Sequence, residues 1–119
     1  MTDAVTCERT VGYFEGGSLA CRVKTYWLVG GFNQDFIGYG CEDCDFYARL
    51  SDGCKWIENR TYDLVHLWHG RVAGWDKHHE TNRALENRLK QKPISERILH
   101  QHQQLSRRGY ADKLREAQN

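Results

Sequence analysis

The sequence has little of what a membrane protein or a disulfide-linked protein would need. No apolar run in its 119 residues approaches the roughly 20 residues of a membrane-spanning helix, so we expect no transmembrane segment. The five cysteines are an odd number, and no secretory signal precedes them, which argues against a disulfide framework. We therefore predict thiols in a reducing environment. The protein is expected to be cytoplasmic, with any membrane contact made through its partners.

A zinc site also lacks half of its usual ligands. Cys41 and Cys44 have the C-x-x-C spacing of zinc and redox sites, but no second C-x-x-C pair accompanies them. The βαβ pattern that surrounds a thioredoxin-like motif is missing as well. A small zinc protein is therefore the weaker interpretation.

Aromatic residues are nearly absent from the second part of the chain, where basic residues gather. Tyr110 is the one aromatic residue after position 75, and residues 66–119 carry eleven Lys/Arg against six Asp/Glu. Residues 1–65 carry ten Asp/Glu against six Lys/Arg. Because aromatic side chains for base stacking are missing and the charges lie at helical spacing, the basic part predicts a solvated helical face, not a nucleic-acid site.

Periodicity and turn residues predict an α/β domain with a small mixed sheet, or α+β for an isolated fragment, and a helical C-terminal tail. Four short runs are predicted as strands: 11–14, 18–23, 54–58 and 63–69. Four helices are predicted: 24–29, 41–52, 76–92 and one from 95 onward. Gly30 suits the left-handed position that ends the first helix, and Pro93 separates the last two. We divide the chain into residues 1–75, with the sheet, and a basic tail, 76–119, lying outside the core.

The most distinctive stretch is the glycine-rich loop before the second predicted helix. Its glycines, at positions 30, 31, 38 and 40, permit conformations and close approaches that side chains would block. Glu42 and Asp43 then fall in the first helical turn, where the helix dipole favours ionised carboxylates. Such a carboxylate can hold a sugar hydroxyl or remove its proton, whereas simple capping of the helix is the alternative. Successive helix residues point about 100° apart, so the two carboxylates would have separate roles.

Two histidines at the end of the last predicted strand are candidate metal ligands. His66 and His69 bracket a tryptophan before a glycine, which suits a divalent metal or a diphosphate. In a regular strand their rings face opposite sides, so one of them would reach a given metal. The remaining histidines lie in polar helical context and are predicted to be solvated: His78, His79, His100 and His102.

The chain resembles the C-terminal half of GT-A-fold glycosyltransferases in three segments: Gly16-Gly-Ser-Leu-Ala, Gly30-Gly-Phe-Asn-Gln-Asp-Phe and Gly38-Tyr-Gly-Cys-Glu-Asp-Cys-Asp. The likeness covers residues 12–75. It is similar to the β-1,4-galactosyltransferase C-terminal region, to polypeptide N-acetylgalactosaminyltransferases and to family 2 glycosyltransferases. The resemblance implies a partial GT-A fold.

The resemblance also implies roles for single residues. Asp43 matches the catalytic base, and Glu42 matches the group that holds an acceptor hydroxyl. Four residues would line the sugars: Gly17, Gly38, Tyr39 and Gly40. His66 or His69 would complete a metal site, and the sequence leaves that choice open. The implied reaction is inverting transfer of a sugar, of galactosyl or N-acetylgalactosaminyl type, from a UDP-sugar to a glycan hydroxyl with Mn²⁺ or Mg²⁺ at the diphosphate.

Departures from the family pattern leave a second interpretation open. Tyr39 stands where the galactosyltransferases prefer Trp, and Cys41 stands where they have Gly. The nucleotide-binding βαβ half with its Asp-x-Asp metal motif has no room before residue 11, and the Asp43-Cys-Asp45 triplet lies in the acceptor motif instead. We therefore expect a separate N-terminal domain or chain to bind the donor. The alternative is a carbohydrate-binding remnant, or a subunit, without turnover of its own.

Overall fold

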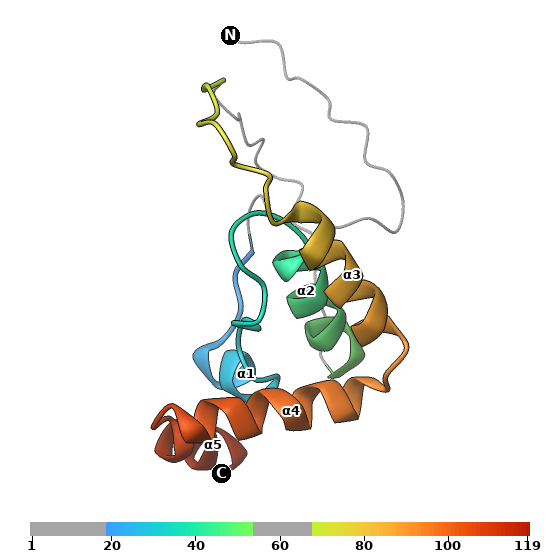
Figure 1. The fold of residues 1–119 in the computed structure, drawn as a ribbon. Helices are drawn as coiled ribbons and strands as arrows, with labels where there is room; N and C mark the ends of the chain where they lie inside the picture. The colour runs from blue at the N-terminus through green and yellow to red at the C-terminus, as the bar shows by residue number, and fades with distance from the viewer. Residues whose placement is uncertain (1–18, 54–67) are drawn as a thin grey trace, which may run out of the picture.

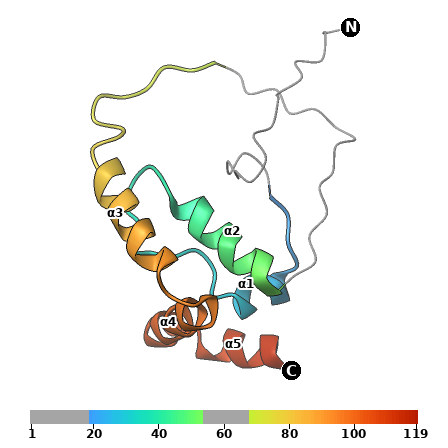
Figure 2. The same cartoon turned by 90° about the vertical axis from the view of Figure 1, so that its right-hand side faces the viewer.

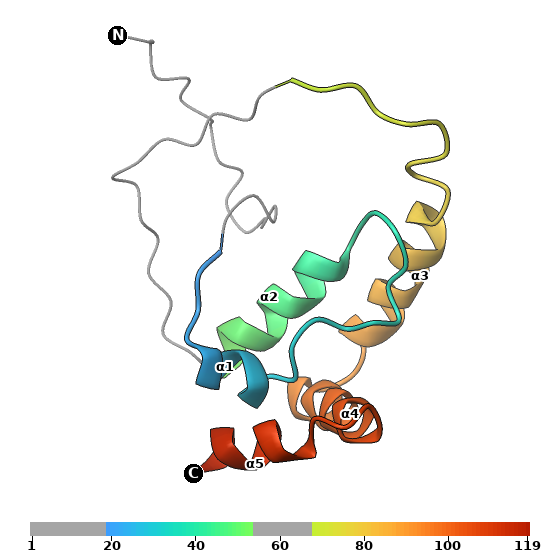
Figure 3. The same cartoon turned by 90° about the vertical axis from the view of Figure 1, so that its left-hand side faces the viewer.

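Five helices make up the part of the chain that the computed structural model describes, residues 19–53 and 68–119 (Figure 1). In chain order they are α1 (Val23–Leu28), α2 (Glu42–Gly53), α3 (His79–Lys90), α4 (Ile94–Arg107) and α5 (Ala111–Gln118). Helix α2 packs against α3 and α4, and α5 packs against α1 and α4. Figure 2 and Figure 3 show α4 crossing below α2 and α3, with α5 beside α1. None of these helices is long and apolar enough to cross a membrane.

The predicted mixed sheet is wrong for the described residues, which contain no strand. Residues 19–22 have no regular structure, and Val23 begins α1 instead of ending a strand. Leu19 and Val23 are 40% and 74% exposed, so the alternating pattern there has no buried face to support a strand. Residues 68–70 also lack regular structure. The predicted strands at 11–14 and 54–58, and most of 63–69, lie outside the described residues.

The helix boundaries follow the turn residues. Gly30, at φ +86°, directly follows the C-cap residue of α1. The Gly30 N–H donates a hydrogen bond to Trp27 O at 3.0 Å, and the Gly31 N–H donates one to Tyr26 O at 2.9 Å. This pair of bonds is the Schellman motif, so the predicted role of Gly30 is confirmed. Pro93 caps the start of α4 and separates it from α3, also as predicted.

A second glycine ends α4 where the sequence analysis predicted one continuous helix. Gly109 has φ +92°, and its N–H bonds to Ser106 O, while the Tyr110 N–H bonds to Leu105 O. The same Schellman geometry therefore closes α4 and lets α5 turn back onto α1.

The core includes side chains from both parts of the chain. Phe46 and Leu50, one helical turn apart on α2, pack with Val29 and with the partly buried Tyr26. Three apolar side chains after residue 75 are buried as well: Leu89, Leu114 and Ala117. The expectation that the helices after residue 75 lie outside the core is therefore wrong for these side chains. The division of the chain at residue 75 stays a prediction.

A buried carboxylate joins α2 to α4. Asp45, 2% exposed, accepts hydrogen bonds from Arg49 Nη2 at 2.8 Å and from Arg97 Nη2 at 2.6 Å. Both arginines are also buried, at 0% and 5% exposure. Burial lowers the pKa of the Arg49 guanidinium, and the charge of Asp45 opposes that shift. We refer to Asp45, Arg49 and Arg97 as the buried ionic triad.

Candidate functional site

The glycine-rich loop between α1 and α2 is fixed at its first end by α2. Arg49 Nη1 donates hydrogen bonds of 2.6 Å to both Val29 O and Gly31 O. The same guanidinium bonds to Asp45 through Nε and Nη2. One buried side chain of α2 therefore fixes the start of the loop that leads into α2 itself.

The other end of the loop is fixed by α3. Asn82, 2% exposed, donates from Nδ2 to Ile37 O at 2.9 Å and to Tyr39 O at 3.0 Å. Its Oδ1 accepts from the Ile37 N–H at 3.2 Å. The three bonds span Gly38 and hold the backbone on both of its sides. Sequence analysis did not identify Asn82, because nothing local distinguishes it from any other asparagine in a polar helix.

Two histidines at the start of α3, the cap residue His78 and the first helical residue His79, close over the loop glycines. A Cβ placed on Gly38 would lie 3.2 Å from His78 Cδ2, and one on Gly40 would lie 2.9 Å from His79 Nδ1. Gly40 also has φ +110°, a conformation that side chains rarely adopt. The prediction that these histidines are solvated is wrong, since both are half-buried and pack on the predicted sugar-binding loop.

The two predicted site carboxylates lie in the first turn of α2, directly after this loop. Asp43 Oδ1 accepts a hydrogen bond of 2.8 Å from the Cys44 N–H, so part of its role is local capping. Glu42 Oε2 is buried and has no hydrogen-bond partner within the described part of the chain. Asp45, the second acid of the Asp-x-Asp spelling, is occupied by two arginines, in agreement with the interpretation that the triplet is not a metal motif.

The cysteines beside these carboxylates are protonated thiols. Burial and a hydrogen bond with Glu86 raise the pKa of Cys41 to about 11. Burial and the nearby Asp43 raise the pKa of Cys44 to about 12. Zinc requires thiolates, and no group of three potential ligands occurs among the described residues. The structure thus gives the zinc interpretation no support.

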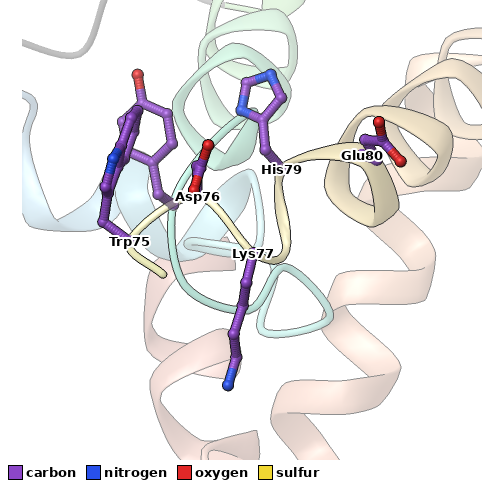
Figure 4. A pocket seen from close by; sticks show the side chains of 6 residues that line it. Trp75, Asp76, Lys77, His79 and Glu80 are labelled. Atoms are coloured by element: carbon purple, nitrogen blue, oxygen red, sulfur yellow. The ribbon is translucent and has the colours of Figure 1, made fainter. Parts of the chain in front are cut away.

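Tyr39 opens onto a cavity of about 510 Å³ at the start of α3 (Figure 4). The lining residues are Tyr39, Trp75, Asp76, Lys77, His79 and Glu80. The Tyr39 ring meets Trp75 edge-on at 4.7 Å and stacks with His79 at 5.7 Å. Arg71 lies 3.7 Å over the Trp75 ring. The cavity combines aromatic surface with carboxylates and an imidazole, a lining suited to a sugar.

The structure says less about the three remaining predicted site residues. His69 is exposed, and its Nδ1 lies 3.0 Å from Gly70 O. Gly17 and His66 lie outside the described residues. Of the predicted site residues, Tyr39 lines the cavity, while Gly38, Gly40, Glu42 and Asp43 lie beside it in the loop and in the first turn of α2; α3 adds Asn82 and His79.

Comparison with known proteins gives one match. Residues 2–69 match the family described as the N-terminal domain of galactosyltransferase. No curated protein and no solved structure matches the chain. The match covers more than half of the chain and includes the whole glycine-rich loop and the start of α2. The family description names an N-terminal domain, whereas the resemblance was to a C-terminal half, so the place of this segment in a longer enzyme stays a prediction.

Proposed function

The chain belongs to the galactosyltransferase family and is a glycosyltransferase domain, and on this premise we propose that its glycine-rich loop and α2 start form the acceptor-sugar site of an inverting transferase. Tyr39 and the glycines on either side of it, Gly38 and Gly40, line the sugar. Glu42 holds an acceptor hydroxyl, and Asp43 is the catalytic base. The transferred sugar is of galactosyl or N-acetylgalactosaminyl type and comes from a UDP-sugar.

The observation that carries the proposal is the buried oxygen of Glu42. A buried carboxylate oxygen without a hydrogen bond has lost its water without compensation, which costs about 1–3 kcal/mol or more. Glu42 Oε2 has no partner in the described part of the chain, and it lies one residue from Cys41, at the end of the glycine-rich loop. A sugar hydroxyl is a donor of the right kind to complete this bond.

Asp43 is suited to the role of base by its place on the helix. Its side chain points about 100° away from that of Glu42, so the two carboxylates contact different atoms. Asp43 takes the proton of the acceptor hydroxyl as the oxygen attacks the anomeric carbon; the bond from that carbon to the diphosphate breaks on the opposite face, and the configuration inverts.

We extend the proposal to a divalent metal, Mn²⁺ or Mg²⁺, with His69 or His66 as a ligand. The His69 Nδ1 lies 3.0 Å from a backbone carbonyl oxygen, and metal-binding histidines commonly donate one ring N–H to such an oxygen. The described residues alone do not form a complete metal site. Such a metal would supply charge neutralisation at the departing diphosphate. The further ligands and the UDP-sugar site belong to an N-terminal domain or a partner chain.

Calorimetry with the full chain tests the proposal. We expect a methyl β-glycoside of glucose, galactose or N-acetylglucosamine to bind, and Glu42→Gln to weaken binding about tenfold or more, because hydrogen bonds to charged groups contribute about 1.5–3 kcal/mol. The exposed Glu96 provides a matched control, since Glu96→Gln should leave the affinity unchanged. Absence of heat with every glycoside would contradict the acceptor site.

A second titration, with UDP-galactose or UDP-N-acetylgalactosamine and Mn²⁺, separates the enzyme from the carbohydrate-binding remnant. Binding of both the glycoside and the nucleotide-sugar supports the enzyme, and binding of the glycoside alone supports the remnant or the need for a donor-binding partner. In an enzyme completed by that partner, Asp43→Asn should abolish transfer without unfolding the protein. Retained turnover in this variant would refute the assignment of the base.

A further inference from the structure

His79 has a defined protonation pattern that the proposed function does not yet use. Its Nε2 lies 3.1 Å from Arg83 Nη2, one helical turn further along α3. A guanidinium can only donate a hydrogen bond, so Nε2 is the acceptor and carries no proton. This contact therefore requires the tautomer whose hydrogen is on Nδ1.

That Nδ1 faces the loop where the acceptor sugar is proposed to lie. A Cβ on Gly40 would stand 2.9 Å from Nδ1, so the ring packs directly on the Gly40 backbone. The described residues provide no hydrogen-bond acceptor for Nδ1. The ring also stacks with Tyr39 at an interplanar angle of 22° and lines the same cavity as Trp75 and Glu80 (Figure 4).

We propose that His79 is a substrate-binding residue, with its Nδ1–H donating a hydrogen bond to a hydroxyl oxygen of the acceptor sugar in the cavity that the ring lines. Arg83 is the positioning residue that keeps the proton on Nδ1. Gly40 is required because a side chain there would displace the His79 ring. This inference rests on the proposed acceptor site and adds to it a donor that complements the carboxylates of Glu42 and Asp43.

Two substitutions of similar size separate donation from packing. The side-chain amide nitrogen of asparagine is separated from Cα by the same number of bonds as Nδ1 of histidine. The side-chain amide nitrogen of glutamine is separated from Cα by the same number of bonds as Nε2 of histidine. His79→Asn should therefore keep the donor near Gly40, and His79→Gln should lose it. Because a hydrogen bond contributes about 1 kcal/mol and 1.4 kcal/mol is tenfold, we expect His79→Gln to weaken glycoside binding about five- to tenfold and His79→Asn to weaken it less.

The test uses the full chain with methyl β-glycosides of glucose, galactose and N-acetylglucosamine as probes. Nitrogen-15 NMR of the histidine rings, with His79 assigned by its loss in His79→Gln, should show the Nδ1–H tautomer. In Arg83→Leu the tautomer should shift toward a mixture, and glycoside affinity should fall although the ring is retained. Circular dichroism confirms that each variant is folded, and Arg88→Leu, exposed on the same helix, is the control for the loss of an arginine.

The outcomes separate this inference from the function on which it rests. An Nε2–H tautomer in the wild-type protein, or equal glycoside affinity in wild type and a folded His79→Gln, overturns the role of His79 and leaves the acceptor site standing. No binding of any glycoside to the wild type overturns the acceptor site and the inference together. A weaker His79→Gln with a nearly normal His79→Asn supports both.

Discussion

Replacing Asp45 by asparagine removes the only negative charge of the buried ionic triad. The carboxylate is 2% exposed and is bonded to Arg49 and Arg97, which are 0% and 5% exposed. Asp45→Asn therefore leaves two buried guanidinium groups without a counter-charge. Loss of one partner of a buried ion pair costs about 3–5 kcal/mol, a large share of the total stability of about 5–15 kcal/mol typical of a domain.

Arg97→Met should lower the free energy of unfolding less than Asp45→Asn does, because the hydrogen bonds between Asp45 and Arg49 remain. Asp45 then keeps both hydrogen bonds from Arg49, at 3.2 and 2.8 Å, so its charge stays paired. The variant loses one charged hydrogen bond between α2 and α4, worth about 1.5–3 kcal/mol. Lys92→Met, just before α4, is the control: it breaks an ion pair with Glu96 at 3.7 Å that is about half exposed, and such pairs contribute about 0–1 kcal/mol.

Urea unfolding followed by circular dichroism measures all three variants. With a slope of about 1–3 kcal/mol/M, Asp45→Asn should lower the midpoint by roughly 2 M, Arg97→Met by about 1 M, and Lys92→Met by less than about 0.5 M. A midpoint for Asp45→Asn within the range of the lysine control would refute the reasoning. The triad would then contribute no net stability, and the packing of α4 on α2 would depend on apolar contacts.

Four further predictions concern the loop and the thiols. Asn82→Leu should lower the free energy of unfolding, measured with urea, by about 1–3 kcal/mol, because backbone N–H and C=O groups of the loop lose their hydrogen-bond partner. The variant should also bind glycosides more weakly. Unchanged affinity would mean that the loop keeps its shape without Asn82. Cys41 has φ +71°, so Cys41→Gly should be about 0.5 kcal/mol more stable than wild type, while Cys44→Gly, inside α2, should be about 1 kcal/mol less stable. At pH 8 iodoacetamide should modify the exposed Cys21 well before Cys41 or Cys44, because the pKa values of those two thiols are raised to about 11 and 12. Equal modification rates, measured by mass spectrometry, would contradict the burial of Cys41 and Cys44. These raised pKa values also mean that the folded chain holds protons that the unfolded chain loses near pH 9, so stability should fall from about pH 9 toward pH 11.

The helices were largely predictable because their signals are local. Gly30 and Pro93 set boundaries through their own backbone preferences, and Phe46 and Leu50 recur at the helical period. The predicted strands failed at residues 19–22 because a short alternating run favours a strand only where one face becomes buried. Gly109 carried the same signal as Gly30 but stands in a polar stretch, where a helix break is harder to distinguish from a tolerated glycine.

The loop and its carboxylates were identified from the sequence, but the residues that hold them were not. Asn82 contacts backbone atoms 43 and 45 positions earlier, and Arg97 contacts a carboxylate 52 positions earlier. No local pattern encodes such contacts, because they depend on how α3 and α4 pack on α2. His79 was predicted to be solvated for the same reason: its helix is polar, and the burial of its ring depends on contact with the distant Gly40.

The dependence of the loop on α3 and α4 leads to a prediction about the limits of the working domain. The family match ends at residue 69, yet Asn82, His79 and Arg97 lie beyond it and make the contacts that fix the loop and α2. A chain of residues 1–75 would lose these contacts and would uncover the surface of α2 on which α3 and α4 now pack. We expect that truncated chain to show little cooperative unfolding in urea and no glycoside binding, whereas a chain of residues 1–110, lacking only α5, should retain the loop contacts. If the 1–75 chain folds and binds a glycoside as tightly as the full chain, the loop is set by the matched segment alone, and the helices after residue 75 are an accessory to the site.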